Sequence, residues 1–289
     1  MVDNQSLYRS EASYHAVMEA YEAVLAAGPV PYTTQWVETR LGQTHAVVGG
    51  PEAGKPVLLF HGWNGSAAGT GDEFPFLFEQ YRVYMPDIVG HAGKSAAVRP
   101  SAAGSTFPDW VADVMAGLGL AQAHMMGISG GGWLALKTAA YLPDRIHKVV
   151  AVNPDGLARL RLRPMLPAIP AVLLKSEASI KRMVRVWAAA DSDSPKLEAF
   201  AQGMIFMMQH FKTQNNPGLI PDAELQRIAC PTCLLIGEHD IFDSAKGMAR
   251  AKQLIPGLAV AEHLPKTGHI LLEEPTKIVA EKVMRFLHE

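Results

Sequence analysis

Short apolar runs that alternate with longer helical stretches are the feature that most constrains the fold of this 289-residue chain. A strand that is covered by helices on both faces needs apolar side chains throughout, so it forms a continuous apolar run. Such runs lie at residues 57–60, 83–85, 124–126, 149–152, 232–236 and 260–263. Their alternation with helical segments predicts an α/β fold, with a mostly parallel sheet and helices on both of its faces.

Helical periodicity fills several of the gaps between these runs. The clearest predicted helices lie at residues 11–27, 130–141, 245–254 and 276–287. In the last of these, Pro275 is predicted at the first helical position, which proline tolerates well. An antiparallel hairpin is predicted over residues 34–40 and 43–48, around a Leu41-Gly42 turn.

The alternation stops after about residue 154 and resumes near residue 223. Residues 157–174 mix three arginines with three prolines, and two helical stretches follow at 177–190 and 196–212. We therefore predict a core made of residues 1–154 and 223–289. Residues 155–222 are predicted to form a helical cap, packed over one end of the sheet.

Charge and composition argue against several classes of function. Apolar residues make up 48% of the chain, charged residues 19%, and the formal net charge is -2. This balance offers no concentrated basic face for nucleic acid. No stretch of about 18 uninterrupted apolar residues predicts a membrane span, and the polar first ten residues show no secretory signal. We expect a cytoplasmic protein with no nucleic-acid or membrane partner.

A G-x-S-x-G motif lies between a predicted strand and a predicted helix, where residues 127–131 read GISGG. In a nucleophile elbow, the serine occupies a strained turn whose neighbours must be small, and Gly127 and Gly131 meet this need. The N-terminus of the following helix then directs N–H groups toward the reacting carbonyl oxygen. The motif predicts Ser129 as a nucleophile, although by itself it also fits an ordinary glycine-rich turn.

A serine hydroxyl needs a base, and the base needs an acid that orients it. Asp240 follows the run at 232–236 and His269 follows the run at 260–263, so both are expected at the carboxyl edge of the sheet. We predict His269 as the base and Asp240 as the acid. The residues that compete for these roles are Glu238, Asp243 and Asp155 for the acid, and His239 and His263 for the base.

Residues 60–63, which read FHGW, follow another predicted strand. An oxyanion hole needs two backbone N–H groups that point at one position. Gly130, the residue after the nucleophile, supplies one of them, and Trp63 is the candidate for the other. His61 is expected to organise this loop. Cys230 and Cys233 are expected to be ordinary thiols, because a lone pair leaves a zinc site two ligands short. We predict no metal and no cofactor.

The predicted cap carries large apolar side chains at helical spacing. They fit core packing, and they also fit a deformable lining for a hydrophobic acyl group. On the second reading, the substrate-binding candidates are Trp187, Met204, Met207 and Met208.

Together these motifs resemble the α/β-hydrolase superfamily. The matching pieces are HGW at 61–63, GISGG at 127–131, GEHD at 237–240 and TGH at 267–269. Residues 37–52, 234–243 and 269–286 are similar to bacterial carboxylesterases of the NP type. The resemblance implies an eight-stranded mostly parallel sheet, a helical cap after strand six, and Trp63 and Gly130 as oxyanion residues. One departure is the loop at 87–95, which is one residue longer than the family's D-x-x-G-x-G-x-S pattern.

The function that these features predict is carboxylesterase-type hydrolysis of a small or medium hydrophobic ester, through an acyl-enzyme on Ser129. Carbon–carbon bond hydrolases, perhydrolases and lyases use the same kind of catalytic triad, so these activities stay open as alternatives. A non-catalytic receptor for a small ligand also stays open. The predicted partner is a small-molecule ester, and assembly into a homodimer is left open.

Overall fold

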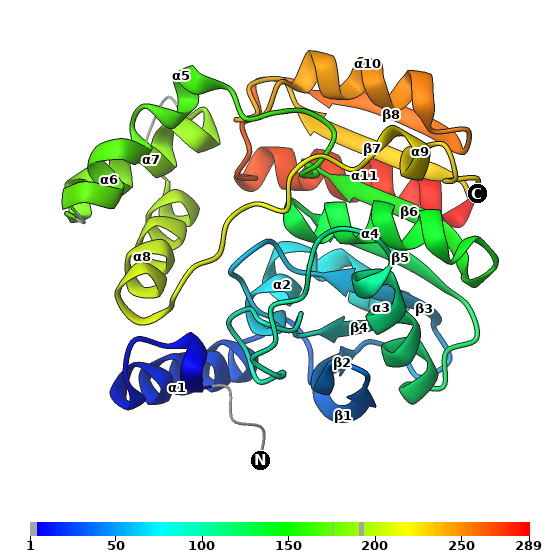
Figure 1. Cartoon of the computed structure of the whole chain (residues 1–289), viewed down its shortest axis with the longest axis horizontal. Helices are drawn as coiled ribbons and strands as arrows, with labels where there is room; N and C mark the ends of the chain where they lie inside the picture. Colours follow the sequence, from blue (N-terminus) through cyan, green and yellow to red (C-terminus); the bar gives the residue numbers. More distant parts are fainter. Residues whose placement is uncertain (1–4, 175, 191–193) are drawn as a thin grey trace.

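The protein is built around an eight-stranded sheet. Figure 1 shows the computed structural model, in which helices surround this sheet. The structure describes residues 5–174, 176–190 and 194–289. In chain order, the strands are β1 Thr33–Thr39, β2 Gly42–Gly49, β3 Lys55–Phe60, β4 Tyr81–Pro86, β5 Ala123–Ile128, β6 Ile146–Val152, β7 Thr232–Gly237 and β8 Leu258–Leu264. Their order across the sheet is β1-β2-β4-β3-β5-β6-β7-β8.

The strand directions confirm the predicted mostly parallel sheet. All neighbouring pairs from β4 through β8 are parallel, whereas β1 pairs antiparallel with β2, and β2 with β4. Each predicted apolar run lies within one of the strands β3 to β8, and the predicted hairpin is β1–β2. Because parallel strands end at the same edge, the loops that follow β3, β5, β6, β7 and β8 gather there.

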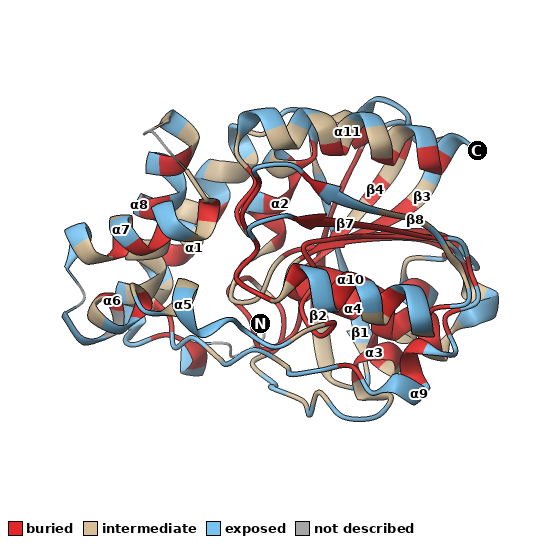
Figure 2. Cartoon of the chain, turned by 90° about the horizontal axis from the view of Figure 1, so that it is seen from above, coloured by how far each residue is buried: buried red, intermediate tan, exposed pale blue. Residues whose placement is uncertain are grey.

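Helices cover both faces of the sheet, as Figure 2 shows from above. One face carries α3 Thr106–Gly117, α4 Gly130–Tyr141 and α10 Ser244–Leu254, and the other carries α2 Ala67–Glu73 and α11 Glu273–His288. Alternate residues of a strand point to opposite faces. In β3, Leu58 and Phe60 accordingly join the first core and Val57 and Leu59 the second. Helix α1, Glu11–Ala26, packs against α2.

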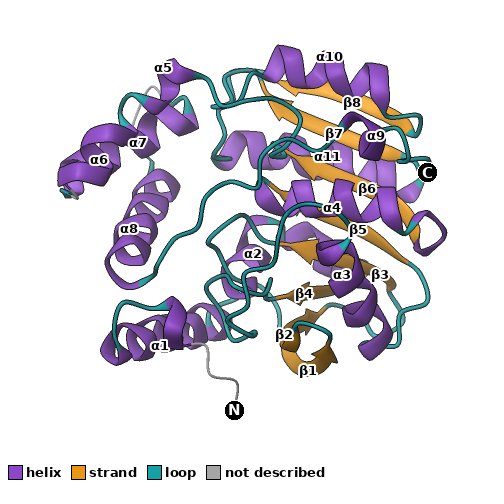
Figure 3. Cartoon of the chain, in the orientation of Figure 1, coloured by secondary structure: helices purple, strands orange, loops and turns teal. Residues whose placement is uncertain are grey.

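A helical segment lies between β6 and β7, to one side of the sheet in Figure 3. Two of its helices match the predicted ones, namely α7 Glu177–Ala188 and α8 Pro195–His210. The segment rich in arginine and proline also contains two short helices that the sequence did not predict, α5 Leu162–Met165 and α6 Ala168–Leu174. A long irregular connection then leads to α9 Asp222–Leu225. The short 3-10 helices are η1 Gln5–Leu7, η2 Pro75–Glu79 and η3 Pro143–Arg145.

The predicted start of the last helix was wrong. Helix α11 begins at Glu273, so Pro275 occupies its third position and not its first. The physical reason is that the first N–H groups of any helix lack an acceptor within the helix. Proline, which has no N–H, is therefore tolerated there without losing a helical hydrogen bond.

A buried ion pair fixes helix α4, which begins directly after Ser129. The Lys137 ammonium donates to Glu224 Oε2 of α9 over 2.6 Å, and the Tyr141 hydroxyl donates to Glu224 Oε1 over 2.9 Å. The Lys137 side chain is only 1% exposed. Removing one partner of such a pair leaves the other charge buried without compensation.

We predict that Lys137→Met lowers the free energy of unfolding by about 3–5 kcal/mol, because Glu224 then stays buried without its cation. A matched control is Lys246→Met, which removes an ion pair with Asp243 whose lysine is 83% exposed. That change is expected to cost less than about 1 kcal/mol. Urea unfolding followed by tryptophan fluorescence measures both. Equal losses in the two variants would contradict the role assigned to Lys137.

Candidate active site

Ser129 lies in a strained turn between β5 and α4. Its φ of 54° and ψ of -121° fall in a region that residues with a side chain rarely adopt. The surrounding backbone is in close contact, because a Cβ on Gly127 would lie 2.2 Å from the carbonyl carbon of Gly131. A Cβ on Gly131 would lie 2.2 Å from the Phe60 carbonyl oxygen. The two flanking glycines are therefore needed for the turn to form.

The structure brings the three predicted catalytic residues into one hydrogen-bonded chain. His269 Nε2 lies 2.9 Å from Ser129 Oγ, and His269 Nδ1 lies 3.1 Å from each carboxylate oxygen of Asp240. Because Nδ1 faces a carboxylate, it carries the ring proton, which leaves Nε2 free to accept from the serine hydroxyl. Asp240 is buried, and its Oδ1 also accepts from the Phe242 N–H at 2.8 Å.

Electrostatics favour a basic imidazole at this position. Burial alone would lower the pKa of His269. The negative charge and hydrogen bond of Asp240, together with the charge of Asp155, nevertheless hold the pKa above its usual value. The ring is therefore a stronger base than an isolated histidine.

The competing acids in the loop after β7 have other partners. Glu238 Oε2 accepts from the Lys266 N–H at 3.1 Å, and Asp243 Oδ1 accepts from the Lys246 N–H at the start of α10. The competing bases are also placed elsewhere, since His239 is exposed and His263 Nε2 lies 3.5 Å from the Ser244 carbonyl oxygen.

The two predicted oxyanion residues are in contact with each other. A Cβ added to Gly130 would lie 2.9 Å from the Trp63 backbone nitrogen. Gly130 is the first residue of α4, so its N–H has no acceptor within the helix. The loop after β3 and the start of α4 thus present two backbone amides beside the serine turn.

Two neutral histidines hold the loop that contains Trp63. His61 Nε2 accepts from the Ile88 N–H at 2.9 Å, so its other nitrogen, Nδ1, donates to the Gly62 carbonyl oxygen at 2.8 Å. His91 Nδ1 accepts from the Asn64 N–H at 2.9 Å. Burial lowers the pKa of both rings. The expected loop-organising role of His61 is confirmed, whereas His91 was not identified from the sequence.

Asn153 is a further residue that the sequence did not reveal. It directly follows β6 with a φ of 42°, a left-handed conformation that asparagine adopts more readily than most residues. Its Nδ2 donates to the carbonyl oxygens of Gly268 at 3.1 Å and His269 at 2.9 Å, and its Oδ1 accepts from the Gly237 N–H at 2.7 Å. One side chain therefore joins the ends of β6 and β7 to the loop that carries His269.

Asp155, which the sequence left as an alternative acid, lies beside Ser129. Its Oδ1 is 3.3 Å from Ser129 Oγ, and its Oδ2 accepts from Asn216 Nδ2 at 2.5 Å. Burial raises the pKa of the Asp155 carboxyl to about 6, although His269 and Ser129 act in the opposite direction. The site thus holds two carboxylates, and Asp240 is the one that contacts the imidazole.

The four predicted substrate-binding residues are placed differently from one another. The Trp187 carbonyl oxygen of α7 accepts from the His269 N–H at 2.6 Å, which brings this helix to the site. Met204 and Met208 pack among α6, α7 and α8, and Met207 packs against the cluster around Tyr8.

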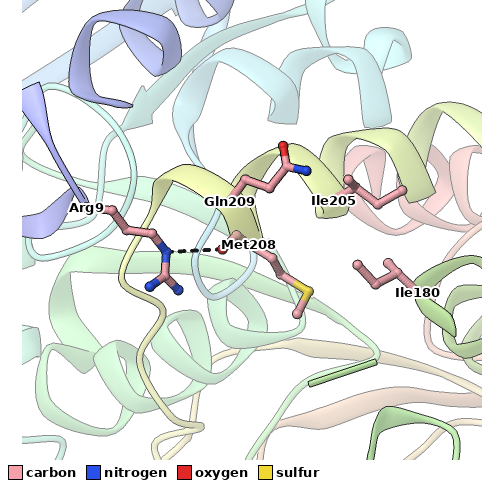
Figure 4. A pocket seen from close by; sticks show the side chains of 5 residues that line it. All are labelled: Arg9, Ile180, Ile205, Met208 and Gln209. Carbon is pink, nitrogen blue, oxygen red and sulfur yellow. Dashed lines mark hydrogen bonds between the residues drawn. The ribbon is translucent and has the colours of Figure 1, made fainter. Parts of the chain in front are cut away.

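Met208 also borders a cavity of about 200 Å³, shown in Figure 4. The residues that line it with Met208 are Arg9, Ile180, Ile205 and Gln209. None of the three predicted catalytic residues belongs to this lining. The binding of substrate by the methionines therefore stays a prediction.

Among the described residues, no group of three or more His, Cys, Asp or Glu side chains is arranged to hold a metal ion. Within the same ranges, every helix is too short or too polar to cross a membrane.

Comparisons with known proteins agree with this geometry. The model of the alpha/beta hydrolase fold family matches residues 55–193. Carboxylesterase YbfK of Bacillus subtilis is 29% identical over 303 residues, which cover 99% of this chain and 98% of YbfK. Its crystal structure has a TM-score of 0.80 at 27% identity, with 96% of this chain and 98% of that chain covered.

A second solved structure supports the same assignment. Naproxen esterase (carboxylesterase NP) from Bacillus subtilis has a TM-score of 0.79 at 25% identity, and 99% of each chain is covered. Topology, the strained serine turn and these similarities together show that the chain has the α/β-hydrolase fold and resembles carboxylesterase NP of Bacillus subtilis.

Proposed function

We propose that this carboxylesterase-type hydrolase cleaves a small or medium hydrophobic ester through an acyl-enzyme on Ser129, with His269 as base and Asp240 as its orienting acid. The observation that carries the proposal is the 2.9 Å contact between Ser129 Oγ and His269 Nε2, with the opposite ring nitrogen against Asp240. The names of the two relatives, a carboxylesterase and a naproxen esterase, support ester hydrolysis.

In the first half of the reaction, His269 Nε2 takes the Ser129 proton as Oγ attacks the ester carbonyl carbon. Asp240 stabilises the resulting imidazolium and keeps the ring oriented. The N–H groups of Trp63 and Gly130 hold the negative carbonyl oxygen, and losing one such donor typically costs about 10²–10³ in rate. The imidazolium then protonates the departing alcohol, which leaves an acyl group on Ser129.

The second half repeats these steps with water as the nucleophile. His269 removes a proton from a water molecule, and the resulting oxygen attacks the acyl carbonyl carbon. Collapse of the second tetrahedral intermediate returns the proton from His269 to Ser129 Oγ and releases the carboxylic acid. The net reaction consumes one ester and one water molecule, and His269 and Ser129 return to their starting protonation states.

Residues 155–222 act in this proposal as a cap over the site. Two contacts support this role of the segment. The Trp187 carbonyl oxygen accepts from the His269 N–H. The irregular segment after α8 also reaches the loop after β3 that contains Trp63, here called the oxyanion loop, where Trp63 Nε1 donates to the Asn215 carbonyl oxygen at 3.0 Å. The cap thereby touches both the base and the oxyanion loop, so its shape affects which ester fits.

We predict that Ser129→Ala lowers kcat/KM for p-nitrophenyl butyrate by about 10⁴-fold or more, because the nucleophile is lost. Labelling with a fluorophosphonate, followed by mass mapping of the peptide, should find the adduct on Ser129. The matched control is Ser101→Ala, which alters an exposed serine and should change neither readout.

Full activity in Ser129→Ala would contradict the proposed mechanism. An unlabelled protein with no ester turnover would point instead to a ligand receptor. A β-diketone substrate assayed in parallel distinguishes carbon–carbon bond hydrolysis, which would show as faster turnover of the diketone than of the ester.

We also predict the direction of the pH dependence. The base works only as neutral imidazole, so kcat/KM falls as pH decreases through the pKa of His269. Because that pKa is held above the ordinary value of 6.5, the midpoint of the acid limb should lie above pH 6.5. In Asp240→Asn, the loss of the carboxylate charge should move the limb to lower pH and reduce kcat by about 10⁴-fold. A pH–rate profile with no acid limb between about pH 5 and pH 8 would contradict His269 as the base.

A further inference from the structure

A second buried carboxylate contacts the reacting oxygen, and the mechanism above does not use it. Asp155 lies in the loop after β6, is 3% exposed, and places Oδ1 at 3.3 Å from Ser129 Oγ. Its own N–H donates to the Ser129 carbonyl oxygen at 3.2 Å, so backbone and side chain both adjoin the nucleophile. Whatever acyl group forms on Ser129 must therefore lie close to this carboxylate.

The carboxylate is held in place from its other side. Asn216 Nδ2 donates to Asp155 Oδ2 at 2.5 Å, and Asn216 Oδ1 accepts from the Gly218 N–H at 2.8 Å. Because Oδ1 is taken by the Gly218 N–H, the amide nitrogen of Asn216 is the end that points at Asp155. With one oxygen toward Ser129 and one toward Asn216, the carboxylate cannot turn away without losing a hydrogen bond.

Within the described ranges, no lysine or arginine pairs with the Asp155 carboxylate. The charged groups that influence Asp155 are His269, which must be neutral to act as the base, and Asp240, which is negative. Arg250, a cation beside this loop, instead donates to the Gly156 and Leu157 carbonyl oxygens and pairs with Asp222. His61 and His91, which hold the loop that contains Trp63, are neutral because burial lowers the pKa of each ring. The site is therefore negative whenever His269 is neutral.

We infer that Asp155 is a specificity-determining residue, whose negative charge beside Ser129 makes the site favour neutral and cationic esters over anionic ones. The inference rests on the proposed function and adds the charge class of its substrate. The physical basis is Coulomb repulsion beside a buried carboxylate, where like charges a few ångströms apart cost far more than in bulk solvent.

The test compares three p-nitrophenyl esters whose acyl chains have equal length and end in a methyl, a sulfonate or a trimethylammonium group. The last two groups keep their charge at every pH used. The measured quantity is the ratio of kcat/KM for the neutral ester to that for the anionic ester, as a function of pH. Because both esters need the same neutral His269, its protonation cancels from this ratio. Any remaining pH dependence reports another group that titrates beside the acyl chain.

In the unaltered protein, we expect the neutral-to-anionic ratio to rise with pH, because Asp155 gains its charge as pH increases through about 6. The rise should reach about tenfold or more, and the cationic ester should show the opposite trend. In Asp155→Asn, the ratio should be flat, and kcat/KM for the anionic ester should increase about tenfold relative to the neutral one. Glu52→Gln, which removes an exposed carboxylate from the β2–β3 turn, is the matched control and should behave like the unaltered protein.

A ratio that does not change with pH in the unaltered protein would overturn the inference, and this measurement does not depend on the folding of any variant. A ratio that rises equally in Asp155→Asn would overturn it as well. Fluorophosphonate titration counts the competent sites in every sample. Failure of the proposed function is distinct, since it would show as an unlabelled Ser129 and no hydrolysis of even the neutral ester.

Discussion

The close contact between the turn after β5 and the end of β3 is the constraint on which the rest of the site depends. Gly131 lies so near the Phe60 carbonyl oxygen that a Cβ would be 2.2 Å from it. Where the two backbones come this close, Ser129 has its positive φ and Gly130 stands beside Trp63. The serine turn and the two backbone amides predicted to hold the oxyanion are therefore brought together by one packing contact. The strain of the turn is offset by the buried sheet and helix that enclose it.

The predicted base, His269, is held by side-chain and backbone hydrogen bonds, because its loop has little regular structure of its own. Asn153 accepts from the end of β7 and donates to the carbonyl oxygens of Gly268 and His269. From the cap side, the Trp187 carbonyl oxygen accepts from the His269 N–H. Polar groups buried in this way are costly unless all are paired, which favours one geometry of the loop over its alternatives. Contacts with the ends of β6 and β7 and with α7 thus fix the position of the His269 imidazole.

Two buried carboxylates of the same site differ in their partners. Asp240 contacts the Nδ1 side of the imidazole and the Phe242 N–H, whereas Asp155 faces a hydroxyl and the amide of Asn216. Burial raises the pKa of Asp155 to about 6, so its charge changes close to neutral pH. Both carboxylates raise the pKa of His269, which links the basicity of the ring to the charge of the whole site.

Much of this architecture follows from local sequence patterns. Apolar runs located all six parallel strands, because a strand buried on both faces has no polar alternation. Motifs after those strands predicted that Ser129, Asp240 and His269 lie together, and the structure places them in contact, because parallel strands bring their carboxyl ends to one edge. Helix starts were less exact, as Pro275 shows, since proline is tolerated at more than one position of the first turn.

Tertiary structure alone decided the rest. The contacts of Asp155 with Ser129 and Asn216, and of Asn153 with the His269 loop, join residues 26, 61, 115 and 116 positions apart in the chain. No local pattern encodes such pairs, because they arise only when separate loops converge on one edge. The placement of the inserted helices could not be predicted either, because they pack on α1 and on the His269 loop, which are remote in sequence.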